Sequence, residues 1–347
     1  MTVGKRVTIK DVAQHAGVSI KTVSNVLNNT GSMRPSTKQR VQESMKELGY
    51  AINISARSLK TGSTKLLGLA IFDFSQPFAP YLVDTVIAAA RKCGYGVIIN
   101  TYGEDGRGLS AIIDETHRLP ADGWIMFADR PFEQEGALLE QPYPIVLVGD
   151  YLAHSKTDWV TMPNRQAMHA VTSRLIEAGC RSIAVLGVPE RIGAHGEHLE
   201  AEEGTQELRI QGYMQALCEH DIEVNWDLLL TWECMLGESG RSAVRNMLDS
   251  GIRPDALICL NDALAFGAMH ELQVSGLRIP QDIQVVGFDN VPEASYSTPA
   301  LTTVDPFIDD YAKHAVDMLI ERIEGYQGEA RTYTTDFTIV ERESTAL

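Results

Sequence analysis

The stretch that decides the fold of the amino-terminal end is TIKDVAQHAGVSIKTVSNVLN, residues 8–28. Four apolar side chains, starting at Ile9, recur with the spacing i, i+3, i+4, i+7, which places them on one face of a helix. Thr8 is suited to cap the start of this helix, and Gly17 is suited to end it in the left-handed conformation. A second amphipathic helix follows, capped by Ser19. Because only a few residues separate the two helices, they must cross sharply, which predicts a helix-turn-helix.

The second helix carries short polar side chains on its predicted outward face. They are hydrogen-bond donors and acceptors together with one cation, which suits base edges and phosphates in a major groove. A helix with a purely structural role more often carries Glu and Lys in i, i+4 pairs at such positions. The outward residues are Ile20, Lys21, Thr22, Ser24 and Asn25. A third helix, between Pro35 and Gly49, completes a small core.

Charge is distributed unevenly along the chain. Residues 1–62 hold ten Lys or Arg and three Asp or Glu, a net charge of +7, whereas the whole chain has a formal net charge of −16. A basic arm on an acidic body is the electrostatic pattern of a protein that binds a polyanion. The alternative for the charge pattern alone is a solvated charged face.

The composition favours a soluble globular protein. The chain has 347 residues, 44% hydrophobic and 22% charged, which fits two or three domains. No apolar run approaches the roughly 20 residues that span a bilayer, and the first residues lack an apolar signal core. We therefore expect a cytoplasmic protein. The five cysteines are scattered and form no CxxC pair, so reduced thiols are expected and neither a disulfide framework nor a zinc site is indicated.

From Leu66 onward, short apolar strands alternate with amphipathic helices, and the pattern restarts after Asp150. This alternation predicts an α/β body of two similar lobes, each a doubly wound parallel sheet. Ligands of such sheets gather beyond the carboxyl ends of the strands. Each polar residue there has a capping or turn role as its alternative, but several together favour ligand binding. The strand-end residues are Asp73, Asp150, Asn261, Asp262, Asp289 and Asn290.

The sequence lacks a recognisable catalytic set. It has no GxxxxGK[ST] phosphate loop, and in GESGR the residue Arg241 replaces the last glycine of a nucleophile elbow. We therefore expect no enzyme activity, no cofactor and no metal. The segment HGEHLEAEEG, residues 195–204, contains metal-ligand residue types without a fixed ligand spacing. A solvated acidic loop or a pocket lid is the preferred interpretation, with a metal site as the alternative.

Three segments, TIKDVAQHAGVSIKTVSNVLN, RVQESMKELGY and ARSLKTGSTKLLGL, resemble the LacI/GalR family of bacterial transcription regulators, and the resemblance extends along nearly the whole chain. It implies a helix-turn-helix headpiece at residues 1–50, a hinge helix and linker at 51–63, and an effector-binding and dimerisation domain at 64–347. That domain would have the periplasmic-binding-protein type I fold, with the chain crossing three times between its lobes. The expected N-lobe comprises about 64–162 and 301–325, and the expected C-lobe about 163–300 and 326–347.

The resemblance also implies which residues face DNA. Ile20, Lys21 and Asn25 would read bases, and Leu59 of the hinge would wedge the minor groove at the operator centre. The family often has Arg at the position of Asn25, which predicts an unusual operator preference. The full set expected to face DNA is Thr8, Ser19, Ile20, Lys21, Thr22, Ser24, Asn25, Asn28, Arg34, Ser55, Ala56, Leu59 and Lys60.

For the effector, the motif ELRIQGY places Arg209 at the position of the family's effector arginine. Phe78 matches an aromatic residue of the first lobe. Trp232 lies near another aromatic position, although the strict register lands on Met235. The full set expected to bind the effector is Asp73, Phe78, Asp150, Arg209, Trp232, Asn261, Asp262 and Asp289.

These patterns predict a transcriptional repressor of carbohydrate-utilisation genes, associated with the nucleoid. A homodimer would bind a pseudo-palindromic DNA operator and leave it when a sugar effector binds. A dimer is expected because no heptad repeat of leucines follows the last strand. The same architecture with a nucleobase or nucleoside effector or co-repressor is the first alternative. A sugar-binding transport module and an α/β enzyme are alternatives of other classes.

Overall fold

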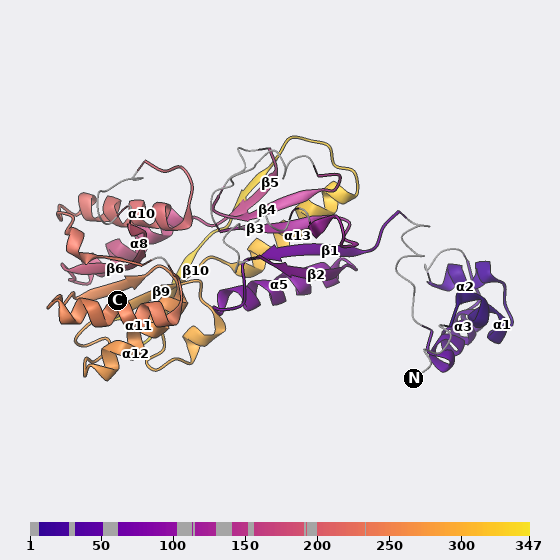
Figure 1. Ribbon diagram of the computed structural model, residues 1–347, viewed down its shortest axis with the longest axis horizontal. Coiled ribbons are helices and arrows are strands. Elements are labelled where there is room, and N and C mark those ends of the chain that lie inside the picture. The colour runs from indigo at the N-terminus through magenta and orange to yellow at the C-terminus, as the bar shows by residue number, and fades with distance from the viewer. Residues whose placement is uncertain are drawn as a thin grey trace. The chain divides into compact units, whose positions relative to one another are not determined.

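The computed structural model describes residues 7–27, 32–50, 62–102, 113, 115–129, 141–151, 156–190, 192, 200–232 and 234–347. The chain divides into two compact units, Met1–Thr64 and Lys65–Leu347 (Figure 1). None of the described helices is long and apolar enough to cross a bilayer.

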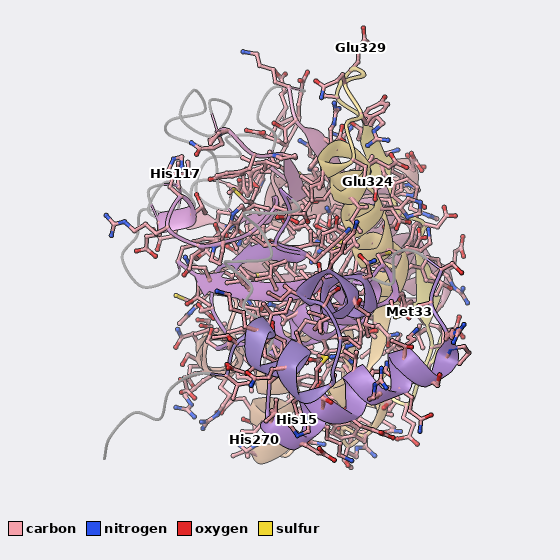
Figure 2. The ribbon with its side chains drawn as sticks, turned by 90° about the vertical axis from the view of Figure 1, so that its right-hand side faces the viewer. His15, Met33, His117, His270, Glu324 and Glu329 are labelled. Atoms are coloured by element: carbon pink, nitrogen blue, oxygen red, sulfur yellow. The ribbon has the colours of Figure 1, made fainter. Side chains whose placement is uncertain are left out.

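The first unit contains the predicted helix-turn-helix, with α1 at Ile9–His15, α2 at Ile20–Leu27 and α3 at Pro35–Leu48. Thr8 begins α1 through a reciprocal capping box, in which its backbone N–H donates to the Asp11 carboxylate at 2.7 Å. Gly17 has φ of +61°, the left-handed conformation that the turn requires. His15, labelled in Figure 2, lies 3.6 Å from Glu47 of α3, measured from Nε2 to Oε2. The small core consists of Val12, Ala13, Ala16, Val23, Val26 and Val41.

Ser24 departs from the predicted outward face of α2. It is 9% exposed and belongs to the buried side of the helix. Helix α2 packs against both α1 and α3, so its buried arc is wider than one neighbour would require. Ser24 follows Val23 by one residue, a rotation that leaves it inside this arc. The outward face is therefore narrower than the sequence suggested.

The second unit contains two six-stranded sheets, in the orders β11-β5-β4-β3-β1-β2 and β12-β10-β9-β8-β6-β7 (Figure 1). All pairings are parallel except that of β10 with β12, which confirms the predicted doubly wound lobes. The first sheet comprises β1 (Leu66–Ile71), β2 (Gly96–Thr101), β3 (Trp124–Ala128), β4 (Ile145–Gly149), β5 (Asp158–Thr161) and β11 (Thr332–Thr334). The second comprises β6 (Ile183–Val188), β7 (Leu229–Thr231), β8 (Ala256–Cys259), β9 (Gln284–Phe288), β10 (Thr302–Asp305) and β12 (Thr338–Val340).

Helices flank both sheets. In the first lobe α5 (Phe78–Lys92) lies beside α13 (Ile308–Ile323), and in the second lobe α8 packs on α10 and α11 on α12. Glycines allow the close approach of these pairs, since a Cβ at Gly240 of α11 would stand 2.2 Å from the Leu264 carbonyl oxygen of α12. The remaining elements are α8 (Asn164–Glu177), α10 (Thr205–Glu219), α11 (Gly237–Asp249), α12 (Asp262–Val274), η2 (Trp226–Leu228) and η3 (Pro292–Ser295).

The lobe boundaries near the carboxyl terminus differ from those expected. Strand β10 pairs with β9 in the second sheet, although residues from 301 were assigned to the N-lobe. Strand β11 pairs with β5 in the first sheet, although residues from 326 were assigned to the C-lobe. Three-residue strands such as β11, with partly exposed Thr side chains, carry little hydrophobic pattern to reveal their sheet. The chain crosses between the lobes at residues 162–163, 306–307 and 335–337.

A buried carboxylate joins β5 to α13 and to the residue that precedes β11. Asp158 of β5 is 1% exposed and accepts hydrogen bonds from Arg322 of α13 and from Arg331, at 2.8 to 3.0 Å. Burial raises the pKa of Asp158, but the hydrogen bonds from Arg322 and Arg331 outweigh this effect and hold the pKa below its ordinary value. The stabilisation is therefore present at neutral pH and is lost as the pH falls through that depressed pKa.

Replacing the buried member of this cluster should unfold the protein more easily. We expect Asp158→Ala to lower the free energy of unfolding by about 3–5 kcal/mol, because the partly buried guanidinium of Arg322 loses its carboxylate partner and that of Arg331 keeps only Glu321. Urea unfolding at pH 7 measures the loss. Asp282→Ala is the matched control, since Asp282 bonds an exposed arginine, Arg278, at 2.7 Å and its loss should change little. Equal effects of the two substitutions would contradict the role given to Asp158.

Candidate functional site

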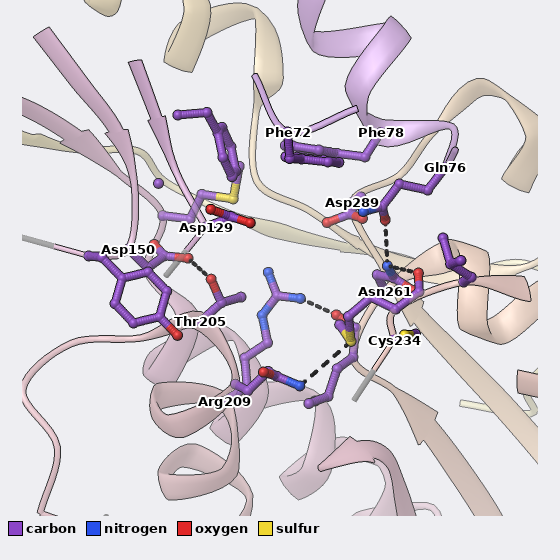
Figure 3. Close-up of a pocket in the computed structure, with 18 of the residues that line it drawn as sticks. Phe72, Gln76, Phe78, Asp129, Asp150, Thr205, Arg209, Cys234, Asn261 and Asp289 are labelled. Carbon is purple, nitrogen blue, oxygen red and sulfur yellow. Dashed lines mark hydrogen bonds between the residues drawn. The ribbon is translucent and has the colours of Figure 1, made fainter. Parts of the chain in front are cut away.

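A cavity of about 760 Å³ lies between the two lobes of the second unit (Figure 3). Its wall is formed by segments that follow β1, β3 and β4 of the first sheet and β6, β7, β8 and β9 of the second, together with the start of α10. These are the carboxyl ends of parallel strands, where open α/β sheets bind ligands. Its volume lies in the range of about 300–1,000 Å³ that is typical of small-molecule sites.

The first lobe supplies an aromatic wall. The ring of Phe127 makes edge-to-face contacts with Phe72, at 5.3 Å between centroids, and with Phe78, at 5.8 Å. Phe72 and Phe78 lie together on one side of the cavity in Figure 3. Both are buried, so their positions are fixed by packing. A flat apolar surface of this kind accepts the C–H face of a ligand ring.

The second lobe supplies a buried cation. Arg209 of α10 is 3% exposed, and its Nε donates to the Asn164 side chain at 2.7 Å while an Nη donates to the Leu260 carbonyl oxygen. The guanidinium carbon lies 3.4 Å from the ring centroid of Phe288. Burial lowers the pKa of Arg209, and the nearby carboxylates of Asp289 and two further acids oppose that change. The group remains a charged donor at the cavity.

Two carboxylates face this arginine, one from each lobe. Asp289, at the end of β9, is 7% exposed, and burial raises its pKa to about 7 even though the charge of Arg209 opposes the change. Asp150, at the end of β4, accepts hydrogen bonds from the hydroxyls of Thr161, at 2.7 Å, and Thr205, at 2.5 Å. Because Thr205 begins α10 of the second lobe, the latter bond bridges the cavity.

Asn261 makes a second bridge between the lobes. Its Oδ1 accepts from the Leu264 N–H at 2.8 Å and so caps α12. Its Nδ2 donates to Gln76 Oε1 of the first lobe at 2.8 Å and to the Met235 carbonyl oxygen at 2.9 Å. Figure 3 shows this pair and the Asp150–Thr205 pair on opposite sides of Arg209. The cavity is thus framed by polar contacts that involve both lobes.

Most of the residues expected to bind an effector line this cavity. They are Asp73, Phe78, Asp150, Arg209, Asn261 and Asp289. Asp262 does not line it: this residue is fully buried and accepts from the Val291 N–H at 2.9 Å and the Thr303 hydroxyl at 2.6 Å, which makes it a structural anchor. Trp232 packs against the core of the second lobe, and Met235 lines the cavity in its place, as the strict register indicated.

Other lining residues were not predicted. Asp129 directly follows β3, so the strand-end rule that selected Asp73 and Asp150 could have found it. Glu190 lies two residues after β6, as Asp73 does after β1, so the same rule could have found it. Phe127 and Gln206 carried no comparable signal, because local spacing does not show which side chains of a strand or helix face a gap between lobes. The remaining lining residues include Phe72, Ser75, Gln76, Tyr151, Met162, Thr205, Cys234, Leu260 and Tyr311.

Residues 195–199 of the acidic segment 195–204 lie outside the described residues, but its last residue contacts the cavity wall. The Gly204 N–H donates to the Asp150 carbonyl oxygen at 2.8 Å. The carboxyl end of the segment therefore lies beside the cavity. Among the described residues, no group of three or more His, Cys, Asp or Glu side chains could hold a metal ion.

In the headpiece, Lys21 and Ile20 are exposed at the start of α2, and Ile20 is 45% exposed although it is apolar. Thr22 and Asn25 are partly exposed beside them. The other residues expected to face DNA differ in what the structure shows of them. Thr8 and Ser19 cap helices, Arg34 is exposed before α3, and Asn28, Ser55, Ala56, Leu59 and Lys60 lie outside the described residues.

Comparison with known proteins decides the family. Residues 8–53 match the model of bacterial regulatory proteins of the lacI family, and residues 172–345 match a periplasmic binding protein-like domain. The chain is 32% identical over 344 residues to the HTH-type transcriptional repressor PurR of Vibrio campbellii, covering 97% of this chain and 98% of that protein. It belongs to the LacI family.

Solved structures of LacI-type regulators agree with this assignment. A regulator from Bifidobacterium animalis subsp. lactis is 58% identical, with a TM-score of 0.78 over 81% of this chain and 100% of that one. The transcriptional regulator CelR, in complex with cellobiose, is 26% identical, with a TM-score of 0.71 over 98% of this chain and 100% of that one. This LacI-family protein is accordingly a DNA-binding transcriptional regulator and not an enzyme. The Lac repressor, 25% identical with a TM-score of 0.78 over 98% of this chain and 99% of that one, was solved as a dimer bound to operator and to the anti-inducer ONPF.

The raised pKa of Asp289 predicts a pH dependence of stability. Since the carboxyl binds its proton more tightly in the folded state, its contribution should fall as the pH rises from about 4 to about 7 and then level off. Asp289→Asn removes this titration. We expect the variant to gain stability relative to the native protein between pH 5 and pH 8 in urea unfolding experiments. Parallel curves for the two proteins would show that burial does not raise the pKa of Asp289.

Proposed function

We propose that this regulator represses carbohydrate-utilisation genes and leaves its operator when a mono- or oligosaccharide binds in the cavity between the lobes. The observation that carries the proposal is the pairing of a phenyl wall with polar groups across one cavity. Phe72 and Phe78 stand on the first lobe, and Arg209 and Asp289 stand on the second. Sugar rings have apolar C–H faces and hydroxyl edges, so they match both walls.

The names of similar proteins are consistent with this proposal. CelR was solved in complex with cellobiose, and the Lac repressor, 25% identical with a TM-score of 0.80, was solved bound to ONPG. A sugar in the cavity would contact both lobes and would favour one arrangement of them over others. The response of operator binding then depends on the effector's difference in affinity for the two arrangements.

A nucleobase is the second candidate effector. The similarity to PurR proteins, 32 to 33% identical over nearly the full chain, favours it. A planar base could lie against the phenyl wall and exchange hydrogen bonds with Asn261. The same cavity would serve both ligand classes, so direct binding must separate them.

Calorimetric titration separates the two classes. The panel contains glucose, galactose, cellobiose, lactose, maltose, sucrose and raffinose, together with adenine, guanine and hypoxanthine. We expect at least one sugar and none of the bases to bind, because the carboxylates, the amide and the guanidinium around the cavity offer partners for several hydroxyls. Binding of a base with no response to any sugar would replace the proposal by the nucleobase alternative.

For DNA, we propose that Ile20, Lys21 and Asn25 contact base edges. The exposed Ile20 side chain suits a thymine methyl group, and Lys21 suits guanine acceptors. Ser24 is left out because its side chain is buried. The proposed contacts to the DNA backbone are Thr8, Ser19, Thr22, Asn28 and Arg34, and those of the hinge are Ser55, Ala56, Leu59 and Lys60.

We further propose a three-part organisation of headpiece (1–50), hinge (51–63) and effector domain (64–347), in which Leu59 of the hinge wedges the minor groove. Two headpieces of a dimer would read the halves of a pseudo-palindrome. The net charge of +7 on residues 1–62 supports the proposal that this region binds DNA. The protein would then be located in the bacterial cytosol, in association with the nucleoid.

Removing one proposed base contact should weaken recognition at one position of the site. We expect Lys21→Ala to cost ~1–3 kcal/mol on the preferred duplex, obtained by selection from random sequences, and to relax preference at one base pair. Fluorescence anisotropy with single-base variants measures both effects. Lys46→Ala, at an exposed lysine of α3, is the matched control. If Lys21→Ala weakens binding equally on every duplex, Lys21 contacts phosphate instead.

A further inference from the structure

The cavity carries an excess of acceptors and of negative charge. Carboxylates line it from both lobes, and Arg209 is the one cation among the lining residues that the structure describes. An ionised carboxylate only accepts hydrogen bonds. The lining carboxylates are those of Asp73, Asp129, Asp150, Glu190 and Asp289.

Most of the side-chain donors of the cavity wall are engaged within the protein. The Asn261 amide donates hydrogen bonds to the Gln76 side chain and to the Met235 carbonyl oxygen. Gln206 donates to the Gly187 carbonyl oxygen at 2.5 Å. Two of the nitrogens of Arg209 already donate within the second lobe. The hydroxyls of Ser75 and Thr205 both donate to lining carboxylates, those of Asp73 and Asp150, at 2.5 Å. A ligand therefore meets more acceptors than available donors.

Tyr311 of α13 is an independent sign that a ligand completes this wall. Its side chain is fully buried and lines the cavity, and the Gly149 N–H faces its hydroxyl oxygen, but the hydroxyl hydrogen has no acceptor among the described residues. A buried donor without an acceptor costs free energy, so a ligand group that accepts from it gains by binding. A ligand hydroxyl can accept from Tyr311 and donate to a carboxylate at the same time.

We propose that the effector is an uncharged polyol whose hydroxyls donate hydrogen bonds to the lining carboxylates. Phosphorylated and carboxylated sugars would be excluded from the cavity. This inference rests on the proposed sugar effector and narrows its chemical class. Every hydroxyl of a neutral sugar donates one hydrogen and accepts others. A phosphate or carboxylate group mainly accepts, and it brings negative charge into a space already lined by carboxylates.

The test uses pairs of sugars that differ only by an anionic group. These are glucose with glucose 6-phosphate, galactose with galacturonate, cellobiose with cellobionate, sucrose with sucrose 6-phosphate and trehalose with trehalose 6-phosphate. Thermal-shift screening followed by calorimetry gives each affinity. We expect the neutral member of any binding pair to bind about a hundredfold more tightly than its anionic counterpart.

The outcomes separate this inference from the proposed function. If an anionic member binds as tightly as its neutral partner or more tightly, the exclusion of anions is wrong while the sugar effector stands. If no sugar binds, or only a purine base does, both the sugar effector and its narrowed class are wrong.

Glu190 lines the cavity and is exposed, so substituting it should change the charge of the cavity without disturbing the packing of the core. Glu190→Gln should narrow the ratio of the two affinities within a pair about tenfold, and Glu190→Lys should narrow it further. Glu223→Gln, at an exposed acid outside the cavity, is the matched control and should leave the ratio unchanged. A purely structural role of Glu190 would move both affinities together, and an unchanged ratio would overturn the inference.

Discussion

The burial of the Arg209 guanidinium is the constraint on which the cavity depends. A cation that is 3% exposed is tolerated only when its hydrogens and its charge find partners within the protein. The Asn164 side chain and the Leu260 carbonyl oxygen accept hydrogen bonds from the guanidinium, and the Phe288 ring lies against it. These partners come from the start of α8, from the residue after β8, and from the end of β9. The hydrogen bonds and ring contact of this one side chain therefore hold the ends of three elements close together.

The countercharge of Arg209 extends this constraint to the other lobe. Asp289 belongs to the second lobe, whereas Asp150 belongs to the first, and both carboxylates act on the same guanidinium. Asp150 is held by Thr205 across the cavity, and Gln76 is held by Asn261 on the opposite side. Under the proposed function, a ligand that pairs with these groups would change the contacts between the lobes. Ligand binding in the cavity would therefore be coupled to the arrangement of the lobes through the residues that form its wall.

How far the sequence predicted the structure depended on how local each signal was. The headpiece was predicted almost entirely, because capping by Thr8, the turn at Gly17 and the apolar spacing from Ile9 are properties of a few neighbouring residues. Ser24 was the exception, since the width of the buried arc depends on two other helices. In the body, alternation predicted two doubly wound lobes, but the short strands β10 and β11 did not show which sheet each would join.

The candidate site shows the same division. Asp262 and Asp289 are both acids at the carboxyl end of a strand, yet Asp289 lines the cavity and Asp262 is buried behind it with Val291 and Thr303. Gln76 and Phe127 reach the cavity because of how the lobes meet, which no local pattern records. Family resemblance placed Arg209 correctly at the cavity, whereas the position of Trp232 required the fold itself.

Operator binding by native protein and by Arg209→Lys, in the presence and absence of a saturating sugar, tests the central claim most directly. Lysine keeps the positive charge but lacks the planar fork that joins Asn164 and Leu260 and stacks on Phe288. Fluorescence anisotropy should show that the sugar weakens operator binding of the native protein at least about tenfold, which is within the usual range of allosteric coupling. The variant should bind the operator equally well with and without the sugar. A variant that responds to the sugar as the native protein does would contradict the account.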